Sequence, residues 1–276
     1  EVDAAIILSY ADIDSKPADR TKFSTTITGT QAALGSHDLV LALSSDPVLD
    51  NEILYALEPE NDGTVQQSLQ FVEPMIGELR YGEQKVKIYL EPGDDLSFTF
   101  HPENFLSSLN FAGKGSAHNN YLKAFANAFA KTNSELKMNT RLSEFPAFIN
   151  FMDGAYAVQL AFFNNFELKD SFSEDFNNYA KADIDFWHAF YLLNYPWEHP
   201  LYHEQEAPMN VPTAYYDFLQ NVEVNTKDAL PNTHYSYFIE QYMEYQISQV
   251  ENKELSKLER ALKKSNSTEL LRLFRK

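Results

Sequence analysis

The chain has 276 residues, of which 44% are hydrophobic, and a formal net charge of −18 at pH 7. This length leaves room for two domains with separate cores, and the hydrophobic share argues against disorder. The acidic excess disfavours binding to nucleic acid or to anionic membrane surfaces, and the absence of cysteine excludes disulfides and thiol chemistry within these residues.

Residues 4–111 are predicted to form short strands joined by turns, because apolar and polar side chains alternate with the period of a strand. The expected strands contain Ile6 and Leu8; Phe23, Thr25 and Ile27 before a turn at Gly29; Leu39, Leu41 and Leu43; residues 53–57; Val65, Leu69 and Phe71; Met75–Tyr81; Gln84–Leu90; and Leu96, Phe98 and Phe100.

Three turn signals predict β-hairpins within this region. They are residues 60–63 (Glu-Asn-Asp-Gly), Gly82-Glu83, and residues 91–95 (Glu-Pro-Gly-Asp-Asp). Glycine tolerates positive φ, proline presets φ, and aspartate accepts a hydrogen bond from its own backbone. Several short strands at this spacing predict an immunoglobulin-like β-sandwich, with a closed barrel as the alternative.

After Gly115 the hydrophobic period becomes helical. Ser116 is expected to cap a first helix, a second should begin near Ser143, and a third should follow Ser173 and stop at Pro196. Residues 198–212 are expected to connect irregularly, before short helices over residues 213–219, 236–250, 253–264 and 267–276. The predicted fold class is therefore α+β in two segregated parts, with an antiparallel immunoglobulin-like β-sandwich over residues 1–112 and an all-helical bundle over residues 113–276.

Two groups of side chains suggest metal sites, and for both a plainer interpretation is preferred. His199 and His203, with His188 and nearby carboxylates, would suit zinc if the segment were helical, but Pro200 opposes a helix and a capping role is expected instead. Acids near the turns offer oxygen ligands without the spacing of a calcium loop, so they are expected to be solvated. These acids are Glu58, Glu60, Asp62, Glu91, Asp94 and Asp95. No metal, cofactor or catalytic residue is predicted.

Aromatic side chains are dense between Trp187 and Tyr245, and most have core spacing. The expected ligand or partner surface consists of Trp197, Tyr202, Tyr215 and Tyr216.

Residues 89–96 (Tyr-Leu-Glu-Pro-Gly-Asp-Asp-Leu) and 109–122 (Leu-Asn-Phe-Ala-Gly-Lys-Gly-Ser-Ala-His-Asn-Asn-Tyr-Leu) resemble the N-terminal region of TlpA-type extracytoplasmic thioredoxin-like proteins. Residues 211–219 and 235–245 are similar to the helical connector of that family. The resemblance spans about residues 39–245. In the family this region precedes a thioredoxin domain with a Cys-x-x-Cys pair, which this chain lacks.

The resemblance implies a non-catalytic accessory and partner-binding module of a thiol-disulfide oxidoreductase, in the periplasm or lipid-anchored to the cell envelope of a Gram-negative bacterium. The implied partners are a client protein, the redox domain that would follow Lys276, or further copies of the chain, and a membrane only through a lipid anchor. One alternative is a stand-alone glycan- or peptide-binding protein using the aromatic-rich half. A second is a hydrolase with carboxylates in the cleft between the halves.

Overall fold

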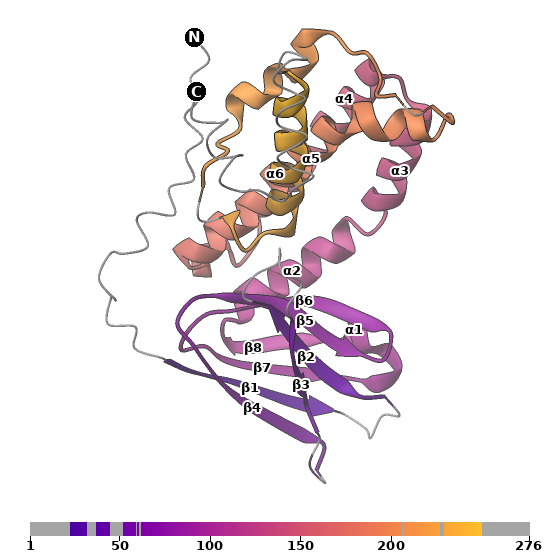
Figure 1. Cartoon of the computed structure of the whole chain (residues 1–276). Coiled ribbons are helices and arrows are strands. Elements are labelled where there is room, and N and C mark those ends of the chain that lie inside the picture. Colours follow the sequence, from indigo (N-terminus) through magenta and orange to yellow (C-terminus); the bar gives the residue numbers. More distant parts are fainter. Residues whose placement is uncertain are drawn as a thin grey trace, which may run out of the picture.

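The computed structural model describes residues 23–31, 37–44, 52–58, 60, 62–205, 207–226 and 229–249. The strand expected around Ile6 and Leu8, and the helices expected over residues 253–264 and 267–276, lie outside the described residues. The chain has a mixed α+β fold, with sheets in its N-terminal half and helices in its C-terminal half (Figure 1).

Eight strands of the described chain form two four-stranded sheets. One sheet has the order β4-β1-β7-β8 and the other the order β3-β2-β5-β6. The strands are β1 (Phe23–Gln31), β2 (Leu39–Ser44), β3 (Glu52–Ala56), β4 (Thr64–Phe71), β5 (Met75–Tyr81), β6 (Gln84–Leu90), β7 (Asp95–Phe100) and β8 (Asn110–Lys114). All pairings are antiparallel except that of β1 with β7, which is parallel.

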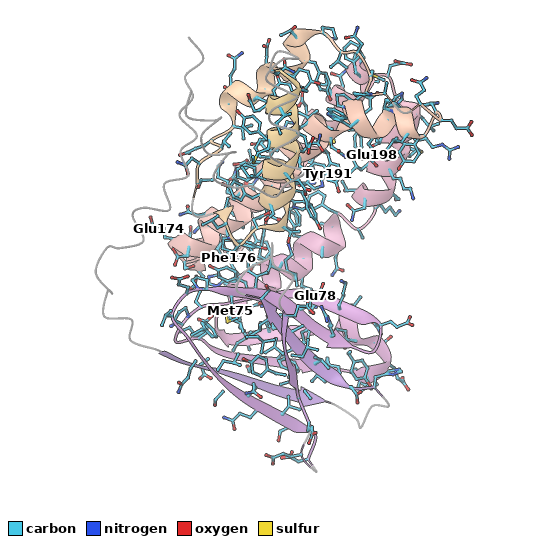
Figure 2. All side chains as sticks on the ribbon, viewed as in Figure 1. Met75, Glu78, Glu174, Phe176, Tyr191 and Glu198 are labelled. Atoms are coloured by element: carbon cyan, nitrogen blue, oxygen red, sulfur yellow. The ribbon has the colours of Figure 1, made fainter. Side chains whose placement is uncertain are left out.

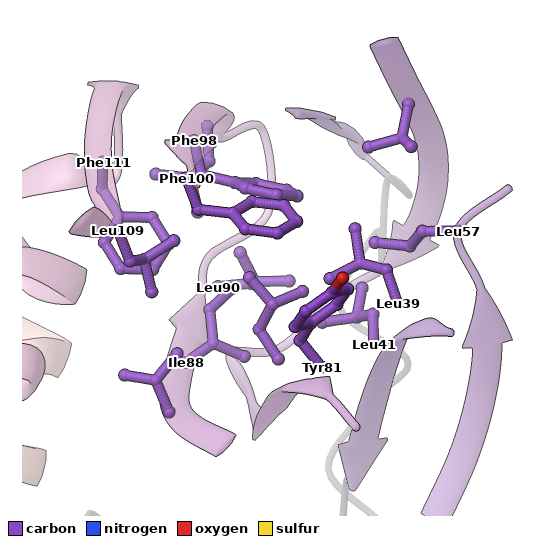
Figure 3. Close-up of a cluster of buried hydrophobic side chains, with 14 of the residues drawn as sticks. Leu39, Leu41, Leu57, Tyr81, Ile88, Leu90, Phe98, Phe100, Leu109 and Phe111 are labelled. Carbon is purple, nitrogen blue, oxygen red and sulfur yellow. The ribbon is translucent and has the colours of Figure 1, made fainter. Parts of the chain in front are cut away.

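The two sheets share one hydrophobic core, which the alternating side chains predicted (Figure 3). Leu41 of β2 and Ile88 of β6 are fully buried from one sheet, and Leu96 of β7 is fully buried from the other. Each such side chain contributes about 1.5–3 kcal/mol by leaving water.

One predicted hairpin is confirmed and two are wrong. β5 and β6 pair across Gly82, which has a φ of 57°. Residues 60–63 and 91–95 form tight turns, but β3 and β4 belong to different sheets, as do β6 and β7. Each turn therefore crosses from one sheet to the other, so that the apolar faces on both sides of the turn enter the shared core.

The turn expected at Gly29 is also wrong. Gly29 lies inside β1, opposite Val65 of β4 and Phe98 of β7. Two neighbouring strands supply enough backbone hydrogen bonds to keep a glycine in extended structure despite its weak strand propensity.

The change from strand to helix occurs at Gly115, whose φ of 91° starts α2. Gly115 occupies the cap position, and Ser116 is the first helical residue instead of the cap. The helices are α1 (Phe105–Ser108), α2 (Ser116–Ala128), α3 (Thr132–Leu142), α4 (Phe145–Asn164), α5 (Glu174–Leu201) and α6 (Thr233–Ser248), with 3₁₀ turns η2 (Pro102–Asn104), η3 (Lys169–Ser171) and η4 (Thr213–Asn221). α3 was not predicted, because its mostly polar sequence buries only Leu136 and Thr140.

The start predicted for α5 is confirmed, since the helix begins at Glu174 and the Ser173 hydroxyl caps it by accepting a hydrogen bond from the Phe176 amide at 3.0 Å. The stop predicted at Pro196 is wrong, because α5 continues through Pro196 and Pro200 to Leu201. Figure 2 shows Phe176 at the end of α5 that faces the sheets, with Tyr191 and Glu198 further along it. Among the described helices, none combines the length and apolarity needed to cross a membrane.

Candidate functional site

Residues of segments 89–96 and 109–122 meet Ser173, the cap of α5, where the sheets join the helices. We call this cluster the joint and define it as Tyr89, Glu91, Phe111, His118, Asn119, Asn120 and Ser173. Its central feature is a pair of adjacent asparagines near the start of α2. Each asparagine side chain binds the backbone of one edge strand, and the two edge strands belong to different sheets.

Asn119 binds β6 of one sheet, and Asn120 binds β8 of the other. The Asn119 oxygen accepts from the Tyr89 amide at 2.9 Å, and its nitrogen donates to the Tyr89 carbonyl at 2.9 Å. Asn120 repeats this pattern with the amide and carbonyl of Phe111 at 3.3 and 2.9 Å. α2 thus hydrogen-bonds edge strands that would otherwise leave unpaired groups, which fixes it to both sheets.

His118 and Ser173 extend the joint to the start of α5. His118 is 4% exposed, its ring stacks on Phe176 at 4.4 Å, and its Nε2 accepts from the Ser173 amide at 3.1 Å. Burial lowers the pKa of His118 to about 4, so the ring is neutral at neutral pH. The Ser173 hydroxyl also donates to Glu91, whose pKa is raised mainly by burial.

Tyr215, one of the four predicted surface residues, is buried and explains why α5 continues past Pro196. A proline has no amide hydrogen, so Pro196 leaves the Leu192 carbonyl without its helical donor. The Tyr215 hydroxyl donates to that carbonyl at 2.6 Å. Pro200 likewise leaves the Pro196 carbonyl without a helical hydrogen-bond donor. That carbonyl accepts a hydrogen bond from the Met209 amide at 2.7 Å instead. Segment 209–215 thereby repairs both breaks in α5.

The other three predicted surface residues are half-buried. The Tyr202 hydroxyl donates to Glu198 at 3.3 Å, and the Tyr216 ring packs against Tyr245 with centroids 4.4 Å apart. Trp197 lies one turn of α5 before Leu201, the last residue of the helix. Because Tyr215 contributes its hydroxyl to α5, it is not available to a ligand.

The histidines act in capping and packing. The Nδ1 of His199 lies 2.7 Å from the Thr140 carbonyl and the Nε2 of His203 lies 3.0 Å from the Arg141 carbonyl, at the C-terminal end of α3. Two of the turn acids bind the backbone of their own turns: Asp94 accepts from the Glu91 amide and Asp62 from the Thr64 amide. Asp62 is exposed as expected, but the expectation is wrong for Asp94, which is 2% exposed. Within the described residues, no group of three or more His, Asp or Glu side chains is placed to hold a metal ion.

A cavity of about 540 Å³ lies in the helical half, between α4, α5 and the segment that follows η4. This volume is in the range of small-molecule sites, roughly 300–1,000 Å³. Phe186 and Ala189 form buried parts of its wall. Its polar lining comprises Tyr156, Asn178, Lys181, Asp185, His188, Asn221, Glu223 and Thr226.

Asp185 is the centre of the polar lining. Its Oδ1 accepts from the Tyr156 hydroxyl at 2.9 Å, and its Oδ2 pairs with Lys181 at 2.5 Å. Burial, helped by the Asp185 charge, raises the pKa of Tyr156 to about 12, so the phenol stays protonated as a donor. The cavity therefore offers hydrogen-bond donors and acceptors side by side.

His188 adds a further polar group. Its Nε2 lies 2.9 Å from Asp153, and burial lowers its pKa despite that carboxylate. A neutral ring that donates from Nε2 to a carboxylate keeps Nδ1 as an acceptor.

The sequence contained one signal for this cavity. Asn178, Lys181 and Asp185 are spaced so that they share one face of a helix, beside the apolar stripe used to predict α5. The contribution of residues 218–226 had no comparable signal, because it depends on how that segment returns to α5.

A scan against protein-family models and a search of curated proteins find no match for this chain.

Proposed function

We propose that this chain is a non-catalytic accessory and partner-binding module of a TlpA-like thiol-disulfide oxidoreductase in an extracytoplasmic compartment. In this proposal the two sheets form an immunoglobulin-like sandwich that carries the helical part. The observation that supports the proposal most is the joint, because the residues that resemble the family are the ones that bind α2 to both sheets.

A rigid joint suits a module that positions another domain. A flexible connection would let an attached domain sample many orientations, whereas Asn119 and Asn120 hold α2 at two points on two sheets. A third connection is the ion pair of Lys87 on β6 with Asp183 on α5, whose Nζ and Oδ2 atoms are 3.5 Å apart. The module would thus present its partner or redox domain in one orientation.

The coding sequence beyond Lys276 and an insulin-reduction assay test this proposal together. We expect a Cys-x-x-Cys pair to be encoded downstream, insulin reduction by the longer protein, and no reduction by this chain alone. A stop codon directly after Lys276, or reductase activity in this chain, contradicts the proposal. Fractionation of the cell envelope tests the proposed location.

A second candidate function, a stand-alone glycan- or peptide-binding protein, is favoured by the cavity around Asp185. Mixed donors and acceptors beside apolar walls suit a neutral, polyhydroxylated ligand better than a strongly charged one. A glycan array followed by calorimetry tests this, with Asp185→Asn expected to weaken binding at least tenfold and Asp170→Asn, outside the cavity lining, as control. An empty array contradicts this candidate, and silence on a glycosidase panel contradicts the carboxylate-hydrolase alternative.

A further inference from the structure

The four edge strands of the two sheets differ in how their outer sides are covered and in which side chains they expose. β6 and β8 are hydrogen-bonded by Asn119 and Asn120. β4 turns Val65 and Leu69 into the core and exposes Gln66, Ser68 and Gln70. β3 instead exposes two large apolar side chains, Ile53 at 50% and Leu54 at 61%. An apolar edge with neither lysine nor proline is a template for strand addition.

The hydrogen bonding of β3 shows which of its backbone groups are free to pair. The Leu57 amide donates to the Leu39 carbonyl of β2 at 2.8 Å. Antiparallel pairs alternate between bonded and non-bonded residues, so Tyr55 and Ile53 also direct their backbone groups at β2. The backbone groups of Glu52, Leu54 and Ala56 point away from β2, and no described strand lies on that side.

We infer that this edge binds the same edge of a second copy of the chain, in antiparallel orientation about a twofold axis at Leu54. In that register Leu54 faces Leu54 of the second copy, and Glu52 faces Ala56. All three outward-pointing residues of each strand then enter bonded pairs, and Ile53 lies opposite Tyr55. The two β3 edges would join into one continuous eight-stranded sheet.

Charge within the strand does not oppose this occupant. Inside β3 no like charges face each other in this register, because Glu52, the charged residue of the strand, lies opposite an alanine. The Glu52 carboxylate is also already paired with Arg80 of β5 at 2.5 Å. A twofold contact repeats one surface on both copies, and the β3 edge is complementary to itself. The inference does not depend on the proposed function.

The oligomeric state tests the inference directly. Because the edge is only five residues long, we expect a weak dimer whose population rises with concentration in sedimentation velocity. Leu54→Lys places like charges opposite one another and should raise the dissociation constant at least tenfold. Val158→Lys, at a 59% exposed site on α4, is the matched control and should leave the dimer intact. A chain that stays monomeric up to millimolar concentration, or a dimer insensitive to Leu54→Lys, overturns the inference.

Hydrogen exchange on the wild-type chain provides a second measurement that needs no variant. The amides of Leu54 and Ala56 should become protected as concentration rises, whereas those of Tyr55 and Leu57, which bind β2, should be protected throughout. Protection of Leu54 and Ala56 that is independent of concentration would mean that another part of the same chain covers the edge, and would overturn the dimer.

Discussion

At the scale of single residues, the hydroxyl of Tyr215 shows how a side chain can substitute for a missing backbone donor. It supplies the hydrogen bond that Pro196 denies to Leu192. A buried carbonyl without a donor costs about 1–3 kcal/mol, so removal of this one oxygen should have a clear effect on stability.

Tyr215→Phe should therefore lower the free energy of unfolding by about 1–3 kcal/mol. Urea denaturation measures the change. Tyr237→Phe is the control, because Tyr237 is 50% exposed and should tolerate the change within about 0.5 kcal/mol. Equal effects at both positions would contradict the assigned role.

A double-mutant cycle separates the hydroxyl from the packing of the ring. Pro196→Ala restores an amide that can donate to the Leu192 carbonyl. Tyr215→Phe should therefore lower the free energy of unfolding by less in the Pro196→Ala background than in the wild-type chain. The expected coupling is about 1 kcal/mol. Strict additivity would show that the carbonyl does not link the two residues.

His118 should make stability depend on pH in a defined window. Its pKa is about 4 in the folded chain and 6.5 ordinarily, so between these values the unfolded chain binds a proton that the folded chain excludes. The free energy of unfolding should fall by up to about 3 kcal/mol as pH drops from 6.5 to 4.

His118→Gln checks this dependence, because an amide oxygen can still accept from Ser173 but does not titrate. Urea denaturation of both proteins at pH 7 and pH 4.5 should show that the free energy of unfolding falls less in the variant than in the wild-type chain. Glu91 works in the opposite direction, since burial raises its pKa, but it is present in both proteins. Parallel losses in the two proteins would contradict the assignment to His118.

At the scale of elements, α2 stabilises both sheets by completing the hydrogen bonds of their outer strands. Asn119 is fully buried and serves both backbone groups of Tyr89. The same polar side chains would be poor choices for a helix packed only against apolar neighbours, since a buried amide needs partners for both its oxygen and its nitrogen. The asparagines are thus explained by the edge strands and not by the helix.

Asn119→Ala should lower the free energy of unfolding by about 2–4 kcal/mol, because two buried backbone groups lose their partners. Hydrogen exchange should locate the loss as faster exchange of the Tyr89 amide. Asn110→Ala, at an exposed position of β8, is the matched control. An unchanged Tyr89 exchange rate would contradict this role.

At the scale of the whole molecule, the sheets and helices are connected by partly buried polar contacts. Burial alone would raise the pKa of Asp183, but Lys87 and His234 outweigh it and hold that pKa well below the ordinary range. Asp183 thus stays ionised between Lys87 of β6, His234 of α6 and the Asn232 side chain, which donates to it at 3.0 Å. Loss of Lys87 would leave this carboxylate poorly compensated.

We therefore expect the two halves to unfold together in one calorimetric transition. The double variant Lys87→Met and Asn119→Ala should separate that transition into two, because it removes connections from β6 to both α5 and α2. Lys85→Met is the control for Lys87, since Lys85 pairs with Glu78 of the neighbouring strand in the same sheet. Two transitions in the wild-type chain would show that the halves are independent.

The sequence alone was enough for the α+β class, most strand positions and the start of α5. Alternation of apolar residues and the Ser173 cap are local properties, and they act in the same way whatever the rest of the chain does. The turns at residues 60–63 and 91–95 were also visible, but a tight turn has the same chemistry whether it closes a hairpin or crosses between sheets.

Only the tertiary structure decided how these elements are joined. The sequence around Pro196 predicts the end of a helix, but α5 continues past it. Tyr215 and Met209, which are distant in the chain, donate hydrogen bonds to the two carbonyls that lose their helical donors at the prolines. Likewise, nothing in the local sequence marks Asn119 and Asn120 as structural residues. Their role depends on the two edge strands that the fold places beside them. Long-range hydrogen bonds of this kind leave no periodic signal, so they emerge only when the segments meet in space.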